Sequence, residues 1–180
     1  HPDKMGVIGN GVVIDPDVLL SEMSQLREVG VEVAGRLAVS DRAHLVMPYH
    51  KVEDGLAEAA MAAAIGQGRE IGTTGRGIGP CYADKAARST AVRAGDLLDL
   101  PGLRARLGLI AVVKNAKLSG LAAAAGRTFE PIDAADLAVT CARWSEDLAP
   151  YVADTTTLLH EAIAHGRRLL FEGANGFLLD

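Results

Sequence analysis

The decapeptide at residues 71–80, Ile-Gly-Thr-Thr-Gly-Arg-Gly-Ile-Gly-Pro, constrains this chain more than any other stretch. Glycine loses much conformational freedom when it is ordered, so a glycine-rich run in a folded chain indicates that something must approach the backbone closely. Thr73, Thr74 and Arg76 add hydroxyl groups and a guanidinium beside the exposed backbone N–H groups. These donors together are typical of a phosphate site, and we interpret residues 71–80 as one.

A flexible surface loop is the plain alternative for such a stretch. Threonine and arginine between the glycines, in place of serine and asparagine, favour the phosphate interpretation. The stretch is not a P-loop, because no Gly-x-x-x-x-Gly-Lys-Ser/Thr occurs in the chain. It is not a dinucleotide fingerprint either, because the glycines at 75, 77 and 79 put the third one place too early.

Composition indicates an ordinary soluble protein. Of the 180 residues, 49% are apolar and 23% are charged, and the net charge of −5 gives no general attraction to nucleic acid or anionic membrane. No uninterrupted apolar run approaches the roughly 20 residues that a membrane span requires. Cys81 and Cys141 are interpreted as reduced thiols in a cytoplasm. We therefore expect a cytoplasmic protein without nucleic-acid or membrane partners.

The hydrophobic pattern alternates between strands and helices, which favours an α/β fold with a mostly parallel sheet and a large helical excursion. Residues 1–180 are expected to form one fragment of a larger α/β domain, with a helical subdomain over about 101–166. Strands are predicted within 7–14, at 37–39 and at 168–171. Helices are predicted over 16–29, 52–65, 82–88, 101–125 (one long helix or two), 134–148 and 155–165.

Two other clusters are weaker candidates. His160 and His165 lie five apart, about 140° around a helix, so they cannot share a metal ion. Cys81 follows the glycine-rich stretch, but no histidine or aspartate stands in an informative place beside it, and we interpret it as a small buried residue. No metal site is predicted within these residues.

Three stretches carry a family resemblance. Residues 7–13 read V-I-G-N-G-V-V, the decapeptide is followed by Tyr82, Asp84, Lys85 and Arg88 and by G-D-L-L-D at 95–99, and residues 171–176 read F-E-G-A-N-G. In this order they closely resemble the adenylosuccinate synthetase family, and the resemblance is faint between 101 and 168.

The resemblance implies a GTP-dependent ligase of purine biosynthesis that joins IMP to L-aspartate through 6-phosphoryl-IMP, with Mg²⁺, on the route to AMP. It also implies a homodimer in which Arg88 crosses the interface to the partner's site, with Lys85 and Arg76 in support. Phe177 replaces a smaller residue common in the family. The IMP-binding residues that it implies are Asn10, Thr73, Thr74, Gly75, Arg88 and Asn175, the last standing where many members have glutamine.

Other family features are missing from the sequence. The Trp-Gly-Asp-Glu-Gly-Lys-Gly-Lys loop that holds GTP, the general-acid histidine and the part that binds guanine and aspartate are not found. The resemblance therefore predicts no catalytic residue and no Mg²⁺ ligand within this segment. We expect it to be the middle of a longer enzyme and to make no adenylosuccinate alone.

Three alternatives stay open. The segment could be a non-catalytic module that binds a nucleoside monophosphate, or a structural dimerisation unit in which Arg88 and Lys85 serve only the interface. It could also belong to a related ligase that acts on another purine monophosphate. A GTP loop encoded upstream would argue against the first, and loss of IMP affinity in Arg88→Ala with the dimer retained would argue against the second.

Overall fold

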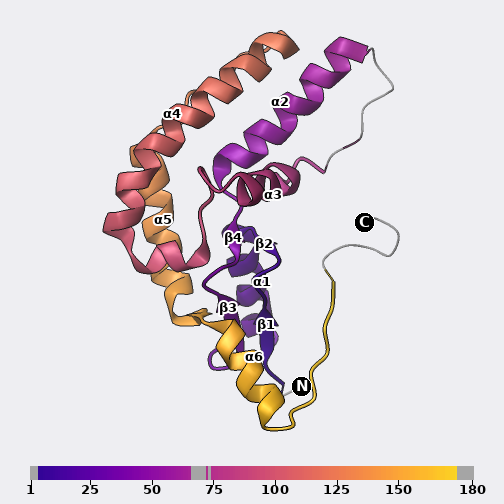
Figure 1. Ribbon diagram of the computed structural model, residues 1–180, viewed down its shortest axis with the longest axis vertical. Coiled ribbons are helices and arrows are strands. Elements are labelled where there is room, and N and C mark those ends of the chain that lie inside the picture. The colour runs from indigo at the N-terminus through magenta and orange to yellow at the C-terminus, as the bar shows by residue number, and fades with distance from the viewer. Residues whose placement is uncertain (1–3, 66–71, 73, 174–180) are drawn as a thin grey trace.

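The computed structural model describes residues 4–65, 72 and 74–173, and helices make up most of this part of the chain (Figure 1). The strands are β1 Gly6–Ile8, β2 Val13–Ile14, β3 Leu37–Ser40, β4 His44–Leu45 and β5 Val152–Ala153. The helices are α1 Pro16–Glu28, α2 Pro48–Ile65, α3 Ile78–Ala87, α4 Leu100–Ala125, α5 Ala134–Leu148 and α6 Thr155–Ala164, with 3₁₀ turns η1 Ala94–Leu98 and η2 Ala149–Tyr151.

The strands form two small parallel sheets. β3 lies between β1 and β5, and β2 pairs with β4. Parallel neighbours need a crossover connection. α1 provides the first one, and the long excursion through α2, α3, α4 and α5 intervenes before β5 returns to β3. The predicted α/β class is confirmed, and β1 and β2 belong to different sheets.

Aspartates start several of the helices. Asp15 precedes α1, its Oδ1 accepts the N–H of Asp17 at 3.2 Å, and Pro16 takes the first helical position. Asp133 and Asp154 cap α5 and α6 in the same way. Each carboxylate satisfies an N–H that has no partner inside its helix, so these starts are fixed locally.

The core of the helical part is built around α4, which lies beside α2 (Figure 1) and also packs on α5. One stripe of α4 is buried, while Leu109 and Val112 on another side are 65% and 68% exposed. The buried apolar residues of the stripe are Leu103, Leu107, Ile110, Ala111, Leu118 and Ala122.

By length and composition alone, α4 is the one helix in the described part of the chain that could cross a membrane. Core helices of soluble proteins pass the same test, so this is weak evidence. α4 also buries the charged Lys114 against two other helices, which is the behaviour of a core helix.

Two predictions about elements need correction. Residues 168–171 are not a buried strand: they form no ladder, and Leu170 and Phe171 are 97% and 76% exposed. A parallel strand is stabilised by neighbours on its edges and faces, and no described element covers this segment (Figure 1). α2 begins at Pro48 instead of 52, because Tyr49 and His50 are buried in its first turn.

Candidate functional site

The loop that enters α3 uses its glycines for their conformational freedom. Gly72, Gly75 and Gly77 have φ values of 70°, 66° and 74°, the left-handed region that other residues rarely adopt. At Gly77 a side chain would also collide with α2, since a Cβ there would lie 2.7 Å from the carbonyl carbon of His50. Position 77 therefore requires glycine for two reasons, the left-handed backbone conformation and the close contact with α2.

The donors predicted to hold a phosphate lie just before this contact. Thr74, Gly75 and Arg76 are exposed. Arg76 and Ile78 also line a groove of about 270 Å³ whose other wall comes from β1, β2 and α1. The loop therefore opens onto the strand ends near the V-I-G-N-G-V-V segment.

A carboxylate of the chain itself occupies the start of α3. The N–H of Gly77 donates to Oδ2 of Asp54 at 3.0 Å, and Asp54 is 9% exposed on α2. This negative charge lies at the positive end of the α3 helix dipole, where it is stabilising. An anion on the loop must therefore use donors other than this N–H, and Thr74 and Arg76 are the nearest along the chain.

A buried charge cluster joins α2, α3 and α4 behind the loop. Nζ of Lys114, with a side chain 2% exposed, lies 2.9 Å from Oε2 of Glu53 and 2.7 Å from Oδ1 of Asp84. Glu53 also accepts from the half-exposed Lys117 at 2.6 Å. Buried charges are tolerated when they are paired and hydrogen-bonded, and here two carboxylates face two ammonium groups.

His50 completes this cluster as a neutral ring. Its Nδ1 accepts the N–H of Met47 at 2.9 Å, so the proton is on Nε2, which donates to Oδ2 of Asp84 at 2.9 Å. Burial lowers the pKa of His50 despite this carboxylate. Burial alone would raise the pKa of Asp84, but hydrogen bonds from His50 and Lys114 outweigh it and hold that pKa below its usual value.

Lys85 connects α3 with the turn after β1. Its Nζ donates to the backbone oxygens of Asn10 at 3.0 Å and Gly11 at 2.7 Å, and it lies over the ring of Tyr82. Asn10 and Lys85, which the sequence analysis selected from separate motifs, are therefore neighbours. The contact fixes the turn against α3.

Arg88 ends α3 in an unusual conformation. Its φ of 67° makes it the one non-glycine residue with positive φ among those described. Its side chain is exposed, and its N–H donates to the carbonyl of Asp84 at 2.7 Å. An arginine held in a disfavoured backbone region suggests a role beyond packing.

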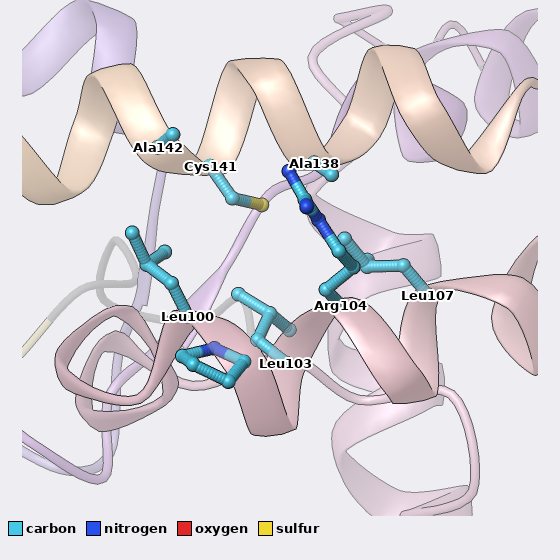
Figure 2. Close-up of a pocket in the computed structure, with 8 residues that line it drawn as sticks. Leu100, Leu103, Arg104, Leu107, Ala138, Cys141 and Ala142 are labelled. Atoms are coloured by element: carbon cyan, nitrogen blue, oxygen red, sulfur yellow. The ribbon is translucent and has the colours of Figure 1, made fainter.

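A second cavity lies away from this loop, between the start of α4 and α5 (Figure 2). It has a volume of about 390 Å³ and a mostly apolar lining that includes Leu100, Leu107 and Cys141. Burial raises the pKa of both cysteine thiols, Cys81 and Cys141, to about 12. Neither is a thiolate at neutral pH, so the interpretation of Cys81 as a small buried residue is confirmed.

Comparison with known proteins identifies the family. The family model for adenylosuccinate synthetase matches residues 1–180. The chain belongs to the adenylosuccinate synthetase family. Adenylosuccinate synthetases of Dehalococcoides mccartyi and Nitratidesulfovibrio vulgaris are 43% and 44% identical over 100% of this chain, which spans 40% of their length. The solved structure of fully ligated adenylosuccinate synthetase from Plasmodium falciparum matches with a TM-score of 0.78 and 27% identity, over 100% of this chain and 39% of that one.

The adenylosuccinate synthetase motifs can now be located. The V-I-G-N-G-V-V motif forms β1, its turn and the start of β2, and the decapeptide enters α3. Thr73, Asn175 and Phe177 lie outside the described residues. Thr74, Gly75 and Arg76 immediately precede α3, and Asn10 contacts Lys85 in the last turn of the same helix.

Sequence reasoning missed the residues of α2 and α4 that hold the loop end and α3 in place. None of these residues was predicted to belong to the site: His50, Glu53, Asp54 and Lys114. One signal was available, because Lys114 continues the spacing of the buried apolar stripe of α4 through Ile110. A lysine at a buried helix position needs a partner, which pointed to a carboxylate on another helix.

Proposed function

We propose that this chain supplies the IMP-phosphate and dimer-side part of an adenylosuccinate synthetase, a ligase that uses GTP to join IMP and L-aspartate. The observation that carries the proposal is the left-handed glycine loop at the start of α3, in a chain whose whole length matches this family.

The loop supplies donors for the phosphate of IMP. Thr74 contributes a hydroxyl and Arg76 a guanidinium, and Gly75 between them carries no side chain to block the approach of the phosphate. Because Asp54 already takes the N–H of Gly77, the phosphate is expected over residues 74–76. Asn10, Thr73 and Asn175 are proposed to complete the binding of IMP.

Arg88 is proposed to act on the neighbouring subunit. It is exposed at the end of α3 and held at positive φ, which suits a guanidinium presented to another molecule. Lys85, fixed on the Asn10 turn, and Arg76 are proposed to support this role. In the homodimer, each protomer would then complete the other's IMP site.

The contribution of these residues to the reaction is positioning. Anchoring the phosphate of IMP holds its purine carbonyl oxygen where the γ-phosphate of GTP can be transferred to it, and such orientation supplies much of the rate in phosphoryl transfer. Mg²⁺ would neutralise charge on the transferring group. No group of three or more histidine, cysteine or acidic residues in the described part of the chain could hold a metal ion, so its residues do not fit Mg²⁺. The catalytic residues are likewise proposed to lie elsewhere in the enzyme.

Calorimetric titration of IMP into the longest natural polypeptide that carries this sequence, hereafter the full polypeptide, tests the proposal. Thr74→Ala is expected to weaken binding about tenfold or more, since hydrogen bonds to charged groups contribute about 1.5–3 kcal/mol. Thr140→Ala, which removes a half-buried hydroxyl on α5 that donates to the carbonyl of Asp136, is the matched control and should not change the Kd for IMP. IMP binding that is unaffected by Thr74→Ala would overturn the proposal.

Arg88→Ala tests the dimer role. Loss of IMP affinity in a variant that remains dimeric is the expected result, and loss of the dimer with IMP affinity retained per subunit would favour a purely structural unit. Binding of IMP without GTP-dependent ligation would favour a non-catalytic nucleotide-binding module. Tighter binding of another purine monophosphate would favour the related ligase.

A further inference from the structure

The C-terminal end of the glycine loop is pinned to α2 at one residue. Gly77 contacts the backbone of His50 and Lys51, and its N–H is held by the nearly buried carboxylate of Asp54. Residues 74–76 immediately precede this point and are exposed. The position of Gly77 therefore decides where the donors of the loop begin.

The charge cluster holds the surface to which the loop is pinned. Lys114 on α4 joins Glu53 on α2 to Asp84 on α3, and His50 ties the first turn of α2 to the same Asp84. Asp54 follows Glu53 directly in the chain. A shift of α3 against α2 would break at least one buried ion pair, which is strongly unfavourable.

We propose that Asp54 is a positioning residue for substrate binding: it fixes Gly77 on a rigid junction of α2, α3 and α4 and thereby sets Thr74, Gly75 and Arg76 for the phosphate. This inference rests on the proposed function. Asp54 touches no substrate in it and positions the phosphate donors through the loop.

The carboxylate has a second effect, which opposes the first. It lies at the N-terminus of α3, where an anion would otherwise bind, and two negative charges close together in a partly buried place repel each other strongly. Asp54 therefore excludes the phosphate from the helix end and directs it to residues 74–76. The hydrogen bond favours IMP binding, while the charge limits its affinity.

Asp54→Asn and Asp54→Ala separate these effects in the full polypeptide. Asparagine keeps an oxygen that accepts from Gly77 but removes the charge, so its Kd for IMP should equal that of the wild type or be a few-fold tighter. Alanine removes the acceptor, so its Kd should be about tenfold weaker. Amide hydrogen exchange without IMP should be faster around Gly77 in Asp54→Ala and unchanged in Asp54→Asn.

Asp99→Ala is the matched control. Asp99 accepts the N–H of Gly102 at 3.1 Å at the start of α4, so it is another aspartate–glycine bond at a helix start, away from the loop. It should change neither the Kd for IMP nor exchange around Gly77. If the wild type binds IMP and both Asp54 variants bind it as tightly as the wild type, the positioning role is overturned. A wild type that binds no IMP would overturn the proposed function instead. Should Asp54→Ala fail to fold, weaker binding in Asp54→Asn would still overturn the inference.

Discussion

The two ends of α3 are held in opposite ways. At its start, Gly77 is buried against α2 and bonded to Asp54, and in its last turn the buried Asp84 is bonded to His50 and Lys114. At its end, Arg88 is exposed and has a positive φ. Gly77 and Asp84 are therefore held by buried contacts with other helices, whereas Arg88 keeps a disfavoured conformation and an exposed side chain.

This difference separates residues that hold the fold together from a residue that is exposed for binding. A buried network of paired charges restricts the arrangement of three helices, because any displacement leaves a charge unpaired. An exposed residue in the left-handed region adds strain that the rest of the fold must outweigh. We therefore expect changes at Gly77 and in the buried ion pairs of Asp84 to reduce stability, and changes at Arg88 to alter binding.

The largest expected effect is that of Lys114→Met. It leaves Glu53 and Asp84 buried with less compensation, and the free energy of unfolding should fall by about 3–5 kcal/mol. Chemical denaturation of the full polypeptide measures it. Lys117→Met is the control, because its half-exposed ammonium group should contribute no more than about 1 kcal/mol. Equal losses would show that the junction is not the anchor.

Gly77→Ala should have the next largest effect on stability. Its Cβ would meet the backbone of His50 at a φ of 74°, and strain together with overpacking should lower stability by about 2–4 kcal/mol. Gly75→Ala has a similar φ but open space around the new Cβ, so about 1–2 kcal/mol is expected there. Thermal unfolding of both variants measures the difference, and a larger loss at Gly75 would contradict the close contact with α2.

Arg88→Gly should increase the stability of the fold. Glycine tolerates positive φ, so stability should rise by about 1 kcal/mol, while IMP binding in the dimer should weaken. Arg88→Ala keeps the strain and should weaken binding without the gain in stability. A gain in both variants would mean that the guanidinium, and not the backbone, is destabilising.

The subtlest prediction concerns pH. The pKa of His50 is lowered in the folded chain, whereas an unfolded histidine has a pKa of about 6.5, so below that pH the unfolded state binds more protons. Stability should therefore fall as pH decreases from 7 towards the folded pKa of His50, and His50→Gln should reduce this slope. Burial also lowers the pKa of His44, so part of the pH dependence of stability should remain in this variant.

Much of the fold could be predicted because its signals are local. Asp15, Asp133 and Asp154 mark helix starts through bonds within three residues, and Gly126 ends α4 in the left-handed conformation. The predicted strand at 168–171 was wrong because strand formation depends on distant neighbours. An apolar run alone does not reveal whether they are present.

The candidate site also has a part that the sequence predicts locally and a part that depends on distant contacts. The glycine loop was evident, since its backbone requirement is written in its own residues. The roles of Asp54 and Lys114 were not, because their partners lie on other helices and only the packing of α2, α3 and α4 brings them together. The contact of Lys85 with Asn10 was also invisible to spacing, although both residues had been selected.

The only tryptophan of the chain, Trp144, is 1% exposed on α5, and its indole N–H donates to Asp17 of α1 at 2.9 Å. The α4–α5 layer and the first crossover helix thus meet at a natural fluorophore. Its emission, read without any label, would report separation of these two layers before the backbone of either helix had melted.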